Sequence, residues 1–148
     1  MQISSYMTDD HVKADEELES SLKKIREGSW DEALRGFELA SRRIKFHIYL
    51  EEEKLFPALK NDSEIVNELM MQHVSIWDLL DQIYKGISER NKETEIKMVL
   101  LMQILKAHNS IEEHIIYEEL DRAFDNNPNI VNELMGSKIT DNWKPKMK

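Results

Sequence analysis

The chain contains no cysteine. Disulfides, iron–sulfur clusters and thiolate-bound zinc are therefore excluded, and any metal ion would have to be held by nitrogen and oxygen atoms. Glycine and proline are also scarce, at 4 and 3 of 148 residues. Because both residues mark turns, their scarcity favours long helices with short connections over a sheet with many turns. We expect an all-α protein.

No stretch of the sequence is apolar enough to cross a membrane, and residues 1–13 lack the apolar segment of a signal peptide. The formal net charge is −9, which would repel nucleic acids and anionic membrane surfaces at long range. We therefore expect a soluble, cytoplasmic protein with no nucleic-acid partner and no membrane partner.

Apolar residues recur at helical spacing in four long segments that are separated by turn-forming residues. Ser29 and Glu32 have the spacing of a capping box, which would open the second helix after Gly28 ends the first. The third helix is expected to follow a turn at Asn61-Asp62-Ser63. The first helix would begin near residues 8–10, and the others would cover about residues 29–59, 64–89 and 94–124.

Connections this short force neighbouring helices to run antiparallel. The predicted fold is an up-down-up-down antiparallel four-helix bundle with a short extra C-terminal helix after Pro128. The bundle is expected to occupy residues 1–136, and a loose C-terminal tail, residues 137–148, would follow, with Trp143 able to pack back. Predicted inward-facing or core-filling residues include Val12, Ile115, Met70, Met71, Met98 and Met102.

Four of the five histidines form a repeated arrangement. His11 precedes His47 by 36 residues, and His73 precedes His108 by 35. The segment HIYLEEEKLF that begins at His47 aligns with HNSIEEHIIY at His108, with aliphatic, acidic and aromatic residues at matching positions. Two similar helical hairpins are therefore expected to face each other across a pseudo-twofold axis. His114 falls on another face of its helix and is expected at the surface.

Each hairpin contains one His-x-x-x-Glu motif, which points an imidazole and a carboxylate the same way because residues i and i+4 share a helix face. A single motif of this kind is usually a surface ion pair, but two copies on apolar stripes need partners for two buried carboxylates. Four histidines and two glutamates could hold two metal ions, with two histidines on each ion. Glutamates that bridge the two ions would offset the repulsion between the cations. The predicted metal ligands are His11, His47, Glu51, His73, His108 and Glu112.

These motifs resemble those of hemerythrin-like proteins of the HHE cation-binding family, and the likeness spans roughly residues 10–120. The resemblance implies a non-heme di-iron centre in which the same six residues hold two iron ions joined by an oxo or hydroxo bridge. Oxygen-carrying hemerythrins have a further histidine four residues after the one on the third helix, where this chain has Trp77. We therefore expect a site closer to the repair-of-iron-centres type than to an oxygen carrier. Trp77 would either wall the open coordination position or simply pack.

The resemblance implies a protein that binds, reduces or senses a small oxidant such as O2, peroxide or nitric oxide, or that handles iron. The same donors would also suit zinc or manganese in a redox-inactive or hydrolytic role. A third interpretation is a metal-free helical interaction module whose histidines pack or cap. In the metal interpretations, Asp15, Glu52 and Glu113 are candidates for carboxylates that orient the imidazoles.

Overall fold

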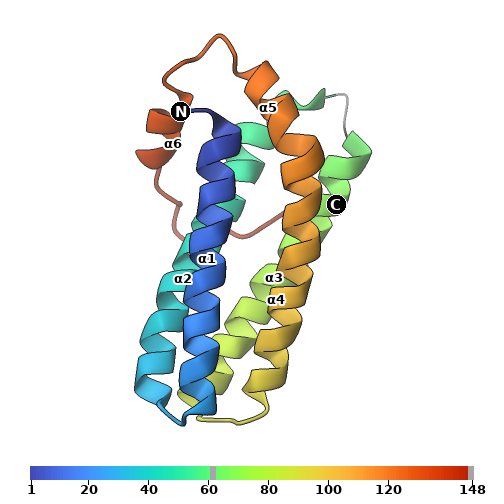
Figure 1. The fold of residues 1–148 in the computed structure, drawn as a ribbon. Coiled ribbons are helices and arrows are strands. Elements are labelled where there is room, and N and C mark those ends of the chain that lie inside the picture. The colour runs from blue at the N-terminus through green and yellow to red at the C-terminus, as the bar shows by residue number, and fades with distance from the viewer. Residues whose placement is uncertain (61–62, 147–148) are drawn as a thin grey trace.

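The computed structural model describes residues 1–60 and 63–146. Within these residues there is no strand, and four long antiparallel helices run along the molecule, with α1 and α4 in front of α2 and α3 (Figure 1). The predicted all-α bundle is confirmed. None of the described helices combines the length and apolar character that a bilayer-spanning segment requires. The long helices are α1 (Ile3–Arg26), α2 (Trp30–Leu50), α3 (Ser63–Ser88) and α4 (Thr94–Ile111).

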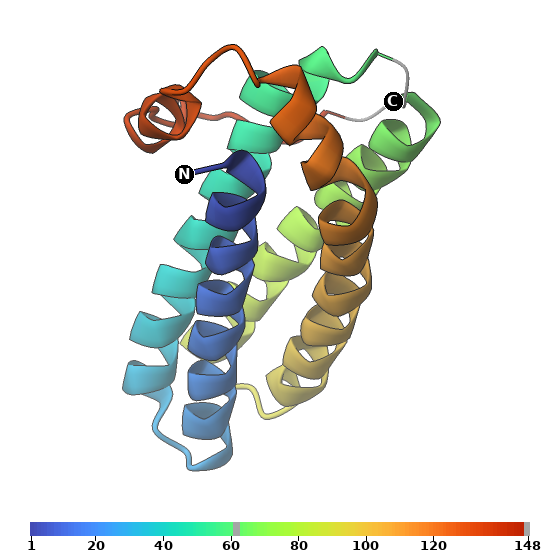
Figure 2. The same cartoon turned by 45° about the horizontal axis from the view of Figure 1, so that its top comes forward.

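Two tight connections close the bundle at the end opposite the N-terminus (Figure 2). In the first, Gly28 has φ +76°, a left-handed conformation that glycine adopts without strain. The N–H of Ser29 then donates to the carbonyl of Lys24 at 2.9 Å, which ends α1 as a Schellman-type turn. Ser29 precedes α2 as predicted, but its side chain forms no capping hydrogen bond, so the predicted capping box is wrong. Glu32 instead pairs with Lys24 at 3.1 Å.

Helix α1 begins earlier than the sequence predicted, at Ile3 rather than near residues 8–10. Ile3 and Met7 are buried, so tertiary contact stabilises additional helical turns that the capping pattern did not indicate. His11 consequently has helix on both sides of it. The predicted turn at Asn61-Asp62-Ser63 includes residues 61 and 62, which lie outside the described residues.

Helices α2 and α4 each continue into a five-residue π-helix that the sequence analysis did not predict. The segment η1 (Glu51–Leu55) follows α2 and leads into the short 3-10 helix η2 (Phe56–Ala58). In the other half, η4 (Glu112–Ile116) follows α4 and leads into α5 (Tyr117–Ala123). Because π-helices are rare, two at matching positions support the internal repeat seen in the sequence.

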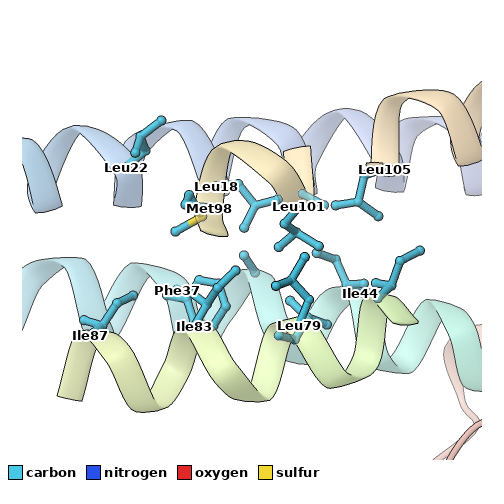
Figure 3. Close-up of a cluster of buried hydrophobic side chains, with 14 of the residues drawn as sticks. Leu18, Leu22, Phe37, Ile44, Leu79, Ile83, Ile87, Met98, Leu101 and Leu105 are labelled. Atoms are coloured by element: carbon cyan, nitrogen blue, oxygen red, sulfur yellow. The ribbon is translucent and has the colours of Figure 1, made fainter. Parts of the chain in front are cut away.

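The buried apolar side chains form two clusters. The first fills the end near the tight connections and includes Phe37 and Leu101 (Figure 3). The second lies toward the N-terminus and includes Leu69 and Leu120. On each long helix, the predicted ligand histidine falls between residues of the two clusters. A polar layer therefore crosses the apolar core.

Three residues predicted to face inward are exposed. Val12 is 49 % exposed because it lies two positions from buried Ala14, on the opposite side of an α-helix. Met71 is 56 % exposed because its neighbour Met70 takes the buried position. Ile115 is 42 % exposed because η4 shifts the helical phase and buries the next residue instead. These predictions were wrong, whereas those for the other methionines hold, with Met70 and Met98 buried and Met102 partly buried.

The short C-terminal helix is present as α6 (Ile130–Met135). Beyond it, the tail returns to the bundle, and the Trp143 ring packs edge-on against Tyr49 and Trp77 with centroid distances of 5.2 and 5.5 Å. The indole N–H of Trp143 donates to Glu53 at 3.2 Å. The prediction that Trp143 packs back is confirmed, and the tail is not loose at this residue.

Candidate metal centre

The polar layer contains the six residues that the sequence predicted as metal ligands. One histidine comes from each long helix, and the two glutamates are the first residues of η1 and η4. All six are buried, with exposed fractions of 0–6 %. The structure thus brings them together, and their role as ligands stays a prediction. They form two overlapping groups, the first half-site (His11, His47, Glu51 and Glu112) and the second half-site (His73, His108, Glu51 and Glu112).

Each glutamate directs one oxygen toward each half-site. Oε2 of Glu51 lies 3.2 Å from Nε2 of His47, while its Oε1 lies 3.0 Å from Nε2 of His73. Glu112 repeats this arrangement with the other two histidines, at 3.2 Å on each side. Two carboxylates that divide their oxygens in this way have the geometry needed to bridge a pair of cations.

Two of the three predicted orienting carboxylates hydrogen bond an imidazole. Oε2 of Glu52 lies 2.8 Å from Nδ1 of His73, and Oε2 of Glu113 lies 2.7 Å from Nδ1 of His11. A bond of this kind fixes the ring so that Nε2 is directed to the centre of the site. Asp15 is exposed and has no hydrogen bond to an imidazole in the described part of the chain, so this prediction was wrong.

Asp10 and Gln72 orient the other two imidazoles, and the sequence analysis missed both. Asp10 lies 2.8 Å from Nδ1 of His47, and the amide oxygen of Gln72 lies 2.7 Å from Nδ1 of His108. Each directly precedes the histidine of the first helix of its hairpin. The available signal was the repeat itself, which places a polar side chain at the same position in both halves.

Tyr117 adds a phenol to the first half-site, which the sequence analysis did not predict. Its side chain is fully buried, and its hydroxyl donates toward Glu51 at 2.7 Å and Glu112 at 2.9 Å. The same oxygen lies 3.0 Å from Nε2 of His11 and 2.9 Å from Nε2 of His47. Burial, followed by the charges of the glutamates, raises the pKa of Tyr117 well above its ordinary value, so the hydroxyl keeps its proton in the metal-free protein.

The π-helix η4 explains how Tyr117 reaches the site. On an uninterrupted α-helix, the fifth residue after Glu112 would point away from it. In η4 the N–H of Tyr117 bonds to the carbonyl of Glu112, which returns the two side chains to one face. Phe56 has the same relation to Glu51 through η1, and its ring stacks on His73 with an interplanar angle of 7°. The paired aromatic residues of the repeat were the signal that could have identified Tyr117.

In the metal-free centre, the charges of neighbouring groups shift the pKa values of the buried histidines and of Glu112. Burial alone would lower the pKa of His47, but the charge of Glu51 and a hydrogen bond to Asp10 raise it to about 10. Burial likewise opposes protonation of His73, yet the surrounding carboxylates raise its pKa well above the usual value. Burial alone would raise the pKa of Glu112, but the nearby imidazoles have the larger combined effect and hold this pKa well below its usual range. At neutral pH, His47 and His73 are therefore protonated and Glu112 is ionised.

Three buried atoms of the second half-site form no hydrogen bond of good geometry within the described part of the chain, although the first and the last are 3.0 Å apart: Oε1 of Glu51, Oε2 of Glu112 and Nε2 of His73. An unpartnered buried polar atom costs about 1–3 kcal/mol, and a bound cation would remove that cost by accepting their lone pairs. Imidazole and carboxylate donors suit iron, manganese and zinc. The residues present therefore fit a pair of bridged metal ions.

The sequence matches the model of the hemerythrin HHE cation-binding domain over residues 2–120. The chain belongs to the hemerythrin HHE family. The matched region contains all six predicted ligands and Tyr117, and it ends within α5. The resemblance inferred from the His-x-x-x-Glu motifs is confirmed at the level of the family. No curated protein and no solved structure matches the chain.

A small cavity in this hemerythrin-like bundle adjoins the metal centre, with a volume of about 20 Å³. That volume is close to the space that one water molecule needs, so the cavity has room for a single small molecule. Beside the polar residues of the centre, its apolar walls are Ala14, Ile44, Ile48, Ile76 and Leu105.

Trp77 does not line this cavity. Its ring instead lies under the ammonium of Lys45, 4.7 Å from ring centroid to Nζ, and against Trp143 of the tail. Of the two roles considered for Trp77, the contacts correspond to packing and not to a wall of the metal centre.

Proposed function

We propose that this hemerythrin-like protein holds two iron ions bridged by Glu51 and Glu112, and that it binds, reduces or senses a small oxidant or handles iron. The observation that carries the proposal is the division of each carboxylate's oxygens between two pairs of histidines. Iron held in this way supplies an open coordination position and electrons for a small oxidant.

The surrounding residues would orient the centre and restrict access to it. Hydrogen bonds donated by the Nδ1–H groups to four side-chain oxygens hold the imidazoles in place, which favours metal binding at Nε2. The cavity of about 20 Å³ admits only a small molecule, and its aliphatic walls favour an uncharged one. O2, peroxide and nitric oxide meet the size requirement.

We further propose that the centre is closer to the repair-of-iron-centres type than to that of oxygen carriers. The support is the residue four positions after His73, which is Trp77 and which contacts Lys45 and the tail instead of the cavity. The described part of the chain therefore offers two histidines to each half-site and no additional one. A site with this symmetry suits iron sensing or iron transfer as well as oxidant binding.

Elemental analysis of protein purified without added metal tests which metal is bound and how many ions each chain holds. We expect two iron ions per chain with near-ultraviolet charge-transfer bands, and loss of both in Glu51→Ala and Glu112→Ala. Asp15→Asn is the matched control, because Asp15 bonds no imidazole, and it should retain the iron. Metal-free wild-type protein, or unchanged spectra in the glutamate variants, contradicts the proposal. Stoichiometric zinc or manganese without such bands supports the alternative metals.

Mixing the anaerobically reduced protein with O2, hydrogen peroxide or nitric oxide tests which of these molecules reacts with the iron centre. We expect at least one of them to change the iron spectrum. Ala14→Leu should slow this reaction without reducing iron content, because the larger side chain projects into the cavity. Ala107→Leu, on the exposed face of α4, is the control and should react normally. A reaction equally fast in both variants would contradict the assignment of this cavity, and an unchanged spectrum with all three oxidants would favour iron handling.

A further inference from the structure

The oxygen of Tyr117 lies at the centre of the first half-site. It is within 3.0 Å of one donor atom from each of the four residues of that half-site. A hydroxyl carries one proton and two lone pairs, so it cannot hydrogen bond fully to four groups at once. The distances therefore suggest a further purpose for this oxygen.

The spacing of these atoms is that of ligands around one metal ion. Two donors at about 2.1 Å from a metal and at right angles are roughly 3.0 Å apart, and opposite donors are roughly 4.2 Å apart. Nε2 of His11 lies 3.1 Å from that of His47 and 3.2 Å from Oε1 of Glu112, and Nε2 of His47 lies 3.2 Å from Oε2 of Glu51. The diagonal from His47 to Glu112 is 4.0 Å. With the Tyr117 oxygen near all four, the set has the spacing of a square pyramid with the phenol at its apex.

Among the described residues, none supplies an equivalent oxygen to the second half-site. Phe56 occupies the corresponding position after η1, and its ring stacks on His73. All three unpartnered polar atoms of the centre lie on this side. One of its histidines is oriented by the uncharged amide of Gln72, whereas carboxylates orient both histidines of the first half-site. The two halves thus differ in donor number and in charge, although the sequence repeat is nearly symmetric.

We propose that Tyr117 is a ligand of the metal ion in the first half-site and that the two metal positions are therefore unequal. The first position has five protein donors, fills first and favours the ion of higher charge, because an oxygen anion and two outer carboxylates surround it. When the ion binds, the phenolic proton is released to solvent. The second position has four protein donors and is the one open to a small ligand. The inference rests on the proposed function only for the presence of the two metal ions.

Spectroscopy of the ferric protein tests the bond between Tyr117 and iron. The wild-type protein is expected to show a visible phenolate-to-iron charge-transfer band and tyrosinate ring modes in its resonance Raman spectrum. Tyr117→Phe removes one oxygen and should lose both signals while keeping the fold, since phenylalanine already occupies the matching position in the other half. Tyr49→Phe removes the same oxygen from a tyrosine outside the centre and should keep both signals.

Calorimetric titration of the metal-free protein with cobalt(II) tests whether the two metal positions differ in affinity. The wild-type protein should bind two ions with constants that differ by at least about tenfold. Loss of an orienting residue weakens a metal site by about 10–100-fold, and loss of a direct donor should do no less, so Tyr117→Phe should weaken the first step by that factor and leave the second nearly unchanged. Two equal steps in the wild-type protein, or two bound ions with no tyrosinate signal, would overturn the inference alone. A protein that binds no metal would overturn the proposed function together with it.

Discussion

The backbone N–H of Lys146 donates a hydrogen bond to Oε1 of Glu52 at 3.0 Å, across 94 positions of the chain. The other oxygen of Glu52 bonds Nδ1 of His73 at 2.8 Å. The C-terminal tail, which lies beyond the region matched by the HHE family model, is therefore connected to the second half-site through one carboxylate. The corresponding carboxylate in the other half, Glu113, forms no hydrogen bond with the described residues of the tail and is partly exposed.

Substitutions at Lys146 separate the backbone contact from the side chain. Lys146→Pro removes the N–H that holds Glu52, and we expect it to weaken metal binding at the second half-site by about 10–100-fold. Lys146→Ala keeps the N–H and loses only the ion pair of Lys146 with Glu53, so it should bind metal nearly as wild type does. Calorimetric titration measures both. Equal affinities in the two variants would show that the tail has no effect on the centre.

The metal-free protein is expected to be most stable at weakly acidic pH. The pKa of His47, about 10, and the raised pKa of His73 exceed the ordinary value of 6.5, so their ion pairs stabilise the fold fully below pH 6.5. That stabilisation is lost as the pH rises toward 10. The pKa of Glu112 lies below its ordinary 4.5, so its contribution is present above pH 4.5 and is lost as the pH falls through the lower folded-state value. Calorimetry of chelator-treated protein should give the highest Tm between pH 4.5 and 6.5.

Bound metal should counteract the loss of stability that the metal-free protein shows above pH 6.5. Ions compete with protons for the imidazole nitrogens, so the metal affinity and the gain in Tm on adding metal should both increase as the pH rises. The protons released on binding can be counted with an indicator dye in weak buffer. A Tm of the metal-free protein that rises steadily from pH 6.5 to 9 would contradict the assigned ion pairs.

Deleting His114 tests whether η4 contains one inserted residue. Its removal makes Tyr117 the fourth residue after Glu112, so the π-helix should become an α-helix that keeps Tyr117 and Leu120 buried. We expect the free energy of unfolding to fall by less than about 1 kcal/mol, because only an exposed residue is lost. Deleting Ala107, which is also exposed but lies in the α-helical part of α4, should instead rotate His108 and Glu112 out of the core and cost more than about 3 kcal/mol. Urea unfolding compares the two deletions, and similar midpoints would refute the prediction.

Two helical glycines should respond oppositely to alanine. A Cβ on Gly86 would overlap the hydroxyl of the buried Thr94, so Gly86→Ala should destabilise the protein by about 1–3 kcal/mol. A Cβ on Gly36 would lie 3.9 Å from its nearest neighbour, Ser21, and Gly36→Ala should stabilise α2 by about 0.5–1 kcal/mol. Thermal unfolding measures both. Neither residue belongs to the metal centre, so metal content should not change.

Much of the fold could be predicted because long helices carry their burial pattern in sequence. Phe37, Ala40 and Ile44 recur with the spacing of a buried helix face, and short connections allow only antiparallel neighbours. The start of α1 was wrong because Ile3 and Met7 are helical through contacts with residues far along the chain, and capping patterns do not report such contacts. Ile115 was wrong because an α-helical period does not continue through a π-helix.

The sequence by itself determined the bundle and the six polar residues at its centre, because a repeated His-x-x-x-Glu motif needs only the helical period to place its side chains on one face. The tertiary structure alone decided what surrounds them. Asp10 and Gln72 reach imidazoles on neighbouring helices, which depends on how the helices are rotated against one another. Tyr117 enters the centre because η4 inserts one residue into a turn, and such an insertion is favourable only when packing on both sides of it fixes the phase of the helix.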